Sequence, residues 1–157
     1  MKQDRFLTGI LIGIGVLIVI ALAVFFTRKD TQTYLSEDVP EGVVHNYVLA
    51  VLNKDYEKAY GYLSDLEDKP TFNEFRRAFL NGEVYPDDQA VDIGEGEIFG
   101  DTATVSLELI HNSSDPFSTG WRDMQTAQLL KQNGAWKLTL MPQYYFWGYE
   151  WYMEEIK

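Results

Sequence analysis

The chain has 157 residues and no cysteine, which excludes disulfides, thiolate metal ligands and a cysteine nucleophile. Its formal net charge of -11 would repel phosphate backbones, so nucleic acid is not an expected partner. The aromatic content of 15% is high for a disordered acidic chain and indicates a packed core. The length suits one domain with an appendage.

The first segment, residues 6–26, follows a short flank of residues 1–5 and carries no charge. As a helix it would rise about 31 Å, close to the roughly 30 Å of hydrocarbon in a bilayer. The pattern therefore predicts a single-pass transmembrane helix. A signal peptide cleaved after Ala23 is the alternative, because Ala21-Leu22-Ala23 resembles a cleavage site, although the apolar run is longer than such peptides usually have.

Charge suggests an orientation for this segment. Basic residues flank both of its ends, so their count alone is tied. Beyond residue 30 the chain has 9 basic and 22 acidic residues, a net charge of 9 - 22 = -13. We therefore expect a cell-membrane protein whose C-terminal domain is extracytoplasmic, tethered through a polar linker at residues 27–39.

The domain is predicted to occupy residues 40–157 and to begin with three helices. Pro40 suits the first position of a helix, with Asp38 as its cap, and Asp55 suits the cap of a short second helix. In 71-TFNE-74, Thr71 and Glu74 form a capping box for the third helix. The first helix has an apolar stripe at helical spacing, made by Val43, Val44, Tyr47, Val48, Val51 and Leu52.

From Gln89 onward the apolar residues alternate, which is typical of strands. The pair Asn133-Gly134 favours a two-residue hairpin turn, in a register that places Leu129 opposite Leu138 and Ala127 opposite Leu140. We expect an α+β domain of about three helices packed in a curved antiparallel sheet of about four strands.

These residues resemble a known group. A first helix leading into 49-LAVLNKDYEKAYGYLS-64, and a sheet ending in 130-LKQNGAWKLT-139, are similar to the nuclear-transport-factor-2-like superfamily, in particular to small bacterial envelope-associated members with an N-terminal anchor. The resemblance implies a cone-shaped fold with a cavity at its wide end. Isomerases, cyclases and many non-catalytic binding modules share that cone, so it implies no particular activity.

Few residues suggest chemistry. His111 is the best acid/base candidate and Asp92 the second, but their spacing does not establish a catalytic pair. Glu108 is expected to face away from the core by strand alternation. Two histidines without companion ligands predict no metal site, and no cofactor is expected. Whether the chain is an enzyme is left open, with a non-catalytic role favoured.

The segment 142–157 is unusually aromatic, and Pro142 suggests that it begins a final helix. We expect it to fold back on the domain and to leave a rim of aromatic residues for binding. The expected function is binding or scaffolding of a protein or envelope component, with homo-oligomers possible. The alternative is a small apolar-ligand binder or an isomerase-like or cyclase-like enzyme. The aromatic candidates for ligand or partner binding are Tyr47, Tyr60, Phe75, Phe79, Trp136, Tyr145, Trp147, Tyr149 and Trp151.

Overall fold

A computed structural model of the chain describes residues 5–27, 32–86, 89–111 and 120–152. The chain divides into two compact units, Met1–Thr33 and Tyr34–Lys157. The first contains one helix, α1 (Arg5–Thr27), and the second contains all the other elements.

The prediction of a transmembrane helix at residues 6–26, and with it a single-pass location in the cell membrane, is contradicted. Within the part of the chain that the structure describes, no helix combines the length and the apolar character that crossing a bilayer requires.

Three helices open the second unit: α2 (Pro40–Leu52), α3 (Tyr56–Gly61) and α4 (Phe72–Leu80). The capping box of α4 is confirmed, because Thr71 and Glu74 bond each other's backbone amides, and Asp55 caps α3 through the amide of Lys58. The expected Asp38 cap is wrong. Val39 occupies that position without a side-chain bond, and the Asp38 carboxylate instead accepts a hydrogen bond from the Ser36 hydroxyl at 2.7 Å.

The sheet has four antiparallel strands in the order β1 (Gln89–Phe99), β2 (Thr102–His111), β3 (Trp121–Gln132) and β4 (Ala135–Leu140). The Asn133-Gly134 hairpin is confirmed, since both residues have positive φ, at 52° and 83°. Leu129 pairs with Leu138 as predicted. The expected pairing of Ala127 with Leu140 is wrong. The register shifts between Gln128 and Leu129, so Gln128 lies opposite Leu140.

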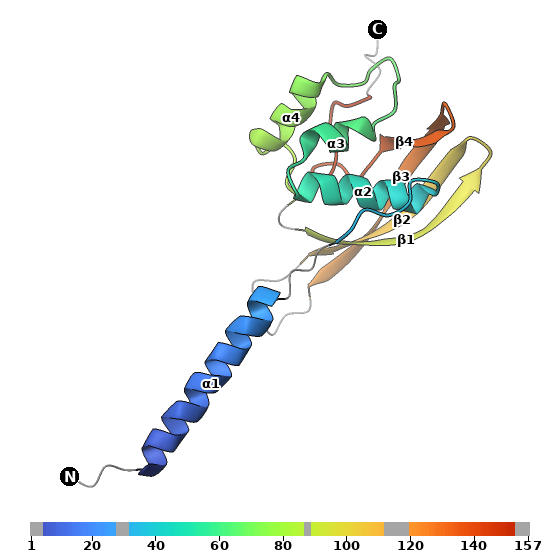
Figure 1. Ribbon diagram of the computed structural model, residues 1–157. Coiled ribbons are helices and arrows are strands. Elements are labelled where there is room, and N and C mark those ends of the chain that lie inside the picture. Colours follow the sequence, from blue (N-terminus) through green and yellow to red (C-terminus); the bar gives the residue numbers. More distant parts are fainter. Residues whose placement is uncertain (1–4, 28–31, 87–88, 112–119, 153–157) are drawn as a thin grey trace. The chain divides into compact units, whose positions relative to one another are not determined.

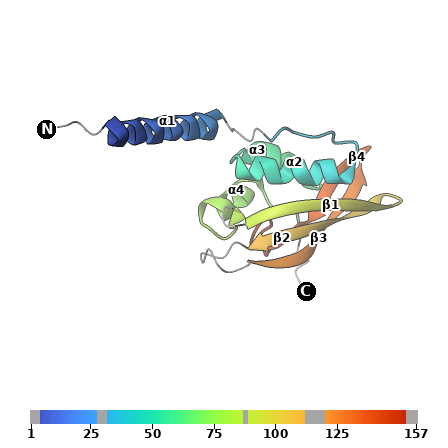
Figure 2. The same cartoon turned by 90° about the horizontal axis from the view of Figure 1, so that it is seen from below.

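Helix α2 packs on one face of the curved sheet, α3 lies beside α2, and α4 packs against α3 (Figures 1 and 2). Strand β2 alternates as predicted, with Ala103, Val105, Leu107 and Leu109 buried toward the helices. Beyond β4, the segment around Leu63 continues the backbone pairing, because the amide of Ser64 donates to the carbonyl of Leu138, and the amide of Leu138 donates to Tyr62, both at 2.8 Å. At an irregularity in β1, the Gly96 amide donates to the Glu41 carboxylate of α2 at 2.7 Å.

Part of the expected linker packs on the domain. The side chain of Asn46 bonds both backbone groups of Leu35, at 2.7 and 2.9 Å, and the Tyr62 hydroxyl donates to Glu37 at 2.7 Å. Burial of Tyr62, and then its bond to Glu37, raise the pKa of the phenol far above its usual value. A Cβ on Gly42 would meet the carbonyl oxygen of Ser36, so only glycine allows this close approach. Residues 34–38 therefore belong to the folded domain.

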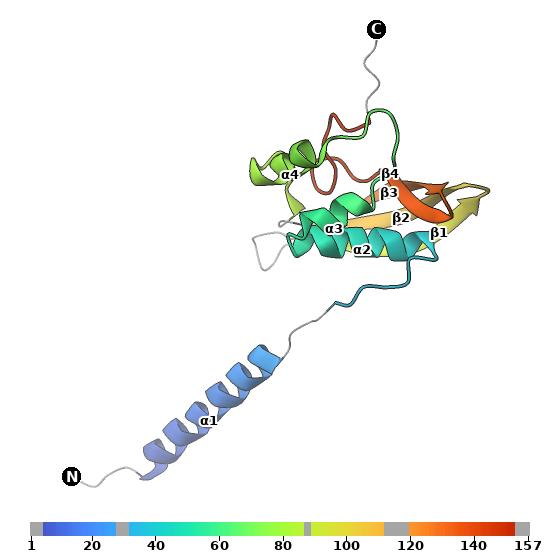
Figure 3. The ribbon, with the colours of Figure 1, turned by 45° about the horizontal axis from the view of Figure 1, so that its top comes forward.

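The C-terminal segment folds back on the domain as expected, but the predicted helix after Pro142 is wrong. Residues 142–152 form turns that lie between β4 and α4 (Figure 3). The aromatic residues of this segment are spaced as in a helix, but their packing against the domain determines the backbone conformation instead. Phe146 and Trp147 are completely buried, and Trp147 lies 6.2 Å from the ring of Tyr47 on α2.

Candidate functional site

The two acid/base candidates lie on opposite faces of the sheet. Asp92 lies opposite Glu108 in the pairing of β1 with β2, so the two side chains share a face. Glu108 belongs to the outward-facing set of β2 and forms an ion pair with Arg122 at 2.9 Å. His111 shares the inward set with the buried Leu109. Because side chains alternate between faces along a strand, Asp92 and His111 cannot act on one substrate from these positions.

His111 is 9% exposed and ends β2. Its ring stacks on Trp121 at 3.5 Å and meets the edge of Tyr145 at 5.6 Å. The Nε2 atom is buried and lacks a hydrogen-bond partner among the described residues. Asp123, one pair further along the same face, accepts a hydrogen bond from Gln125 at 2.6 Å. The loop expected beside His111, residues 112–119, lies outside the described residues.

Most of the aromatic candidates form the core. Tyr47, Phe75 and Trp147 are fully buried, and three others are nearly so: Phe79, Trp136 and Trp151. Their rings contact one another, with Trp151 lying 4.9 Å from Phe75 and 5.2 Å from Trp147. Tyr60 and Tyr145 are half-buried. Only Tyr149 in the predicted set is largely exposed, at 53%.

The structure instead places a surface groove beside the C-terminal segment. We define the groove as the hollow of about 1280 Å³ between the loop 68–70, helix α4, the turn 81–85 and the segment 144–151. It lies outside the sheet–helix core. Its lining residues are Asp68, Lys69, Pro70, Glu74, Arg77, Ala78, Asn81, Gly82, Glu83, Tyr85, Tyr144, Gly148, Tyr149, Glu150 and Trp151.

Trp151 anchors the segment that forms one wall of the groove. Its indole is 9% exposed and packs on Phe75 and Phe79 of α4. Gly148 makes this position possible, because a Cβ there would come within 2.4 Å of the Trp151 ring. The amide of Trp151 also donates to the Gly148 carbonyl at 3.3 Å. The wall is therefore a fixed part of the fold.

Three tyrosines line the groove with exposed rings: Tyr85, Tyr144 and Tyr149, at 58%, 54% and 53%. The rings of Tyr144 and Tyr149 stack at 6.1 Å with an angle of 16° between their planes. The carbonyl of Tyr144 accepts a hydrogen bond from the Tyr85 amide at 2.7 Å, which ties two parts of the rim together. Tyr144 has φ of 68°, a conformation that costs a residue with a side chain about 1 kcal/mol.

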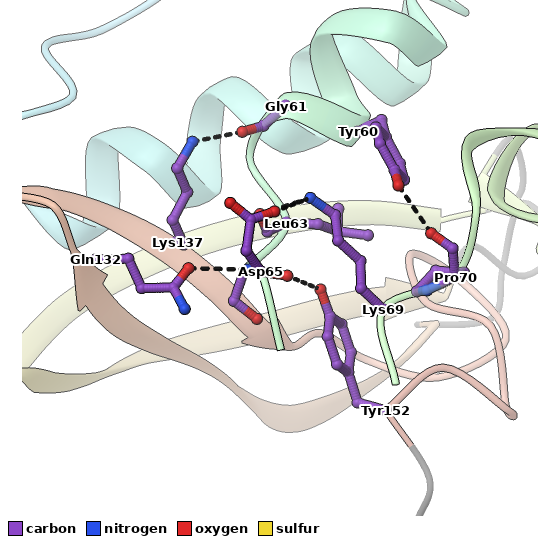
Figure 4. Close-up of polar contacts among 10 residues, drawn as sticks. Tyr60, Gly61, Leu63, Asp65, Lys69, Pro70, Gln132, Lys137 and Tyr152 are labelled. Carbon is purple, nitrogen blue, oxygen red and sulfur yellow. Dashed lines mark hydrogen bonds and ion pairs between the residues drawn. The ribbon is translucent and has the colours of Figure 1, made fainter. Parts of the chain in front are cut away.

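Polar contacts hold the loop that borders the groove (Figure 4). Lys69 bonds Asp65 at 2.7 Å, and the Asp65 amide donates to the side chain of Gln132 at 2.8 Å. The Tyr152 hydroxyl donates to the carbonyl of Ser64, and its amide donates to Asp68 at 3.2 Å. Burial raises the pKa of Tyr152 to about 12.

Sequence reasoning located one wall of the groove and missed the other. The aromatic density of the C-terminal segment pointed to Tyr149. Tyr85 follows α4 at a distance of more than fifty residues from that segment, and no local pattern joins the two. One sequence feature could have pointed to Tyr85. The turn-forming residues Gly82 and Pro86 lie on either side of it, which is typical of a surface turn.

No protein-family model matches the chain, and no curated protein is similar to it. Solved structures are similar in fold. A SEC-C motif containing protein from Rhodopseudomonas palustris is 15% identical with a TM-score of 0.50, over 68% of this chain and 79% of that one. This likeness concerns the fold alone.

Two further solved structures match with lower TM-scores. A protein named as an NTF2-like transpeptidase, from Campylobacter jejuni, is 15% identical over 65% of this chain and 98% of its own, with a TM-score of 0.44. A cystatin-fold protein from Novosphingobium aromaticivorans is 9% identical over 66% and 95%, with a TM-score of 0.44. Both TM-scores are below 0.5, so these two likenesses carry no argument about this chain.

Proposed function

We propose that the domain Tyr34–Lys157 is a non-enzymatic binding module with the cone fold of the nuclear-transport-factor-2-like superfamily, and that it contacts a protein partner through the groove. The observation that carries the proposal is the exposure of Tyr85, Tyr144 and Tyr149 together on one hollow. Tyrosine is enriched in protein interfaces because it contributes a large rigid contact area and a polar hydroxyl.

The left-handed backbone of Tyr144 supports the same proposal. Two backbone hydrogen bonds hold this conformation, from the Tyr144 amide to Trp147 at 3.0 Å and from the Tyr85 amide to the Tyr144 carbonyl at 2.7 Å, and it presents a ring that is 54% exposed. Backbone strain of this kind is concentrated at binding and catalytic sites.

The alternative, an apolar ligand or a reaction inside the cone, has less support. The aromatic side chains expected to line that cavity pack against each other in the core, as Tyr47, Phe75 and Trp136 do. Among the described residues, His111 lies without a carboxylate or hydroxyl in hydrogen-bond contact with its Nε2 atom.

A quantitative pull-down with the full chain tests the proposal. Wild type is compared with Tyr144→Ala/Tyr149→Ala and with the control Phe99→Ala, which removes an aromatic ring of 62% exposure at the β1–β2 turn. We expect a partner that is retained by wild type and by the control and is lost from the double variant. Equal recovery by all three proteins would refute a role for the groove.

A further inference from the structure

We propose that the partner enters the groove as an extended polypeptide segment carrying lysine or arginine side chains. This inference rests on the function proposed above and specifies the chemistry of the occupant. It follows from the charge of the groove lining, from the availability of its acidic residues and from the exposed tyrosine rings beside them.

Acidic side chains outnumber basic ones in the groove. Four carboxylates line it, from Asp68, Glu74, Glu83 and Glu150, against the two cations of Lys69 and Arg77. The sequence beyond residue 30 has a net charge of 9 - 22 = -13, so the surrounding field has the same sign. A hollow with this charge raises the local concentration of cations and disfavours anionic ligands.

One basic residue of the groove, Lys69, is already paired, and most of the acidic residues form no ion pair among the described residues. Lys69 forms an ion pair with Asp65 at 2.7 Å and lies 4.5 Å over the ring of Tyr60. Hydrogen bonds with Thr71 lower the pKa of the Glu74 carboxyl, and the charge of Arg77 lowers it further. Neither salt bridge among the described residues involves the remaining three groove carboxylates, Asp68, Glu83 and Glu150, although Glu83 accepts a hydrogen bond from the Asn81 side chain at 3.3 Å.

The exposed rings provide a second kind of contact for a cation. A lysine or arginine head group is attracted to the face of an aromatic ring, even at an exposed site. The domain already uses this contact within itself, since Lys58 lies 3.2 Å from the ring centre of Tyr34. The stacked pair Tyr144 and Tyr149 offers such faces next to the carboxylate of Glu150.

The size of the groove favours a polypeptide over a small cation. Its volume of about 1280 Å³ exceeds the roughly 300–1,000 Å³ of typical small-molecule pockets. The acidic and aromatic residues are also spread over three separate parts of the chain, the loop at Asp68, the turn at Glu83 and the segment at Glu150. A segment with several cationic side chains would contact all three parts, and a single small cation would not.

Fluorescence anisotropy with the full chain tests the inference. The probes are labelled twelve-residue peptides of Gly-Ser sequence with lysine, arginine or glutamate at every third position. We expect the two cationic peptides to bind and the acidic one not to bind. Failure of both cationic peptides to bind, or equal binding of the acidic peptide, would overturn the inference.

Matched charge variants separate the groove from the general acidity of the domain. Glu83→Gln/Glu150→Gln removes two charges from the groove, and Glu95→Gln/Glu97→Gln removes two from exposed positions of β1. We expect the groove variant to bind the lysine peptide at least fivefold more weakly and the β1 variant to stay within twofold of wild type. Equal weakening in both would overturn the inference, because a long-range field would then explain the binding.

The peptide experiment and the pull-down can fail independently, so failure of this inference can be told apart from failure of the proposed function. If the pull-down partner depends on Tyr144 and Tyr149 while the cationic peptides fail to bind, the groove is a binding site for other chemistry and only this inference falls. If the partner is also unaffected by the tyrosine substitutions, the proposed function falls as well.

Discussion

The hydroxyl of Tyr47 donates a hydrogen bond of 2.6 Å to the carbonyl oxygen of Phe146, and both residues are fully buried. This bond joins α2 to the C-terminal segment across 99 positions of sequence. We expect Tyr47→Phe to lower the free energy of unfolding by about 1–2 kcal/mol, because the carbonyl loses a buried donor. Urea denaturation measures the change. Tyr149→Phe, which alters an exposed ring, is the control and should change stability very little.

The stability of the domain should fall at alkaline pH. Burial raises the pKa of Tyr152 to about 12 and that of Tyr47 well above its usual value, whereas in the unfolded chain both titrate near about 10. Above that pH the unfolded state loses protons that the folded state retains, so the free energy of unfolding decreases as pH rises from about 10 to 12. Urea midpoints at about pH 8, 10 and 11 measure the slope.

Substitution of Tyr152 separates this effect from other alkaline changes. Tyr152→Phe should unfold at a lower urea concentration at neutral pH, because it loses the bond to Ser64, but its stability should depend less on pH above about 10. A slope identical to that of wild type would show that Tyr152 does not retain its proton in the folded state.

The contact between Glu41 and Gly96 should be sensitive to a single methyl group. A Cβ on Gly96 would lie 2.7 Å from Glu41 Oε1 and 2.9 Å from its Cδ, so Gly96→Ala should cost about 1–3 kcal/mol of stability. Gly61→Ala is the matched control, because a Cβ at the end of α3 would meet nothing within 4 Å. There we expect a gain of up to about 1 kcal/mol in thermal or urea unfolding.

Deletion of residues 143–157 should prevent cooperative folding of the domain. It removes Phe146, Trp147 and Trp151 from the core, and truncation of one such aromatic side chain alone typically costs about 3–5 kcal/mol. Three such losses approach the whole stability of a typical domain. Thermal unfolding followed by circular dichroism measures this. A sharp transition at the wild-type temperature would mean that the segment serves only to recruit a partner.

Local signals predicted the elements well, and tertiary packing explains where they failed. Asn133-Gly134 determines its hairpin through the backbone of two adjacent residues. The shift after Gln128 depends on how β3 and β4 meet over several residues, so alternation alone placed Leu140 opposite the wrong partner. The C-terminal segment has a helix-like spacing of rings, but the contacts of Trp147 and Trp151 with α2 and α4 determine its turns.

The groove was less predictable than the fold. Aromatic density identified the C-terminal segment as a place of interest, but exposure separates Tyr149 from the buried Trp147, and exposure depends on the complete fold. The positions of His111 and Asp92 could not be predicted either. Alternation shows which residues of one strand share a face, but only the register between β1 and β2 shows which faces of the two strands coincide. A site whose residues come from distant segments can be predicted only after the register between the strands is known.

The bond between Glu41 and Gly96 also bears on self-association. An open sheet has two outer strands whose free backbone groups can recruit a strand from another molecule, which leads to aggregation. At β4 the segment around Leu63 occupies that position, and at β1 the Glu41 carboxylate takes the amide of Gly96 where the strand is already irregular. A second molecule that paired with β1 would have to displace this bond, and one that paired with β4 would have to displace the segment around Leu63.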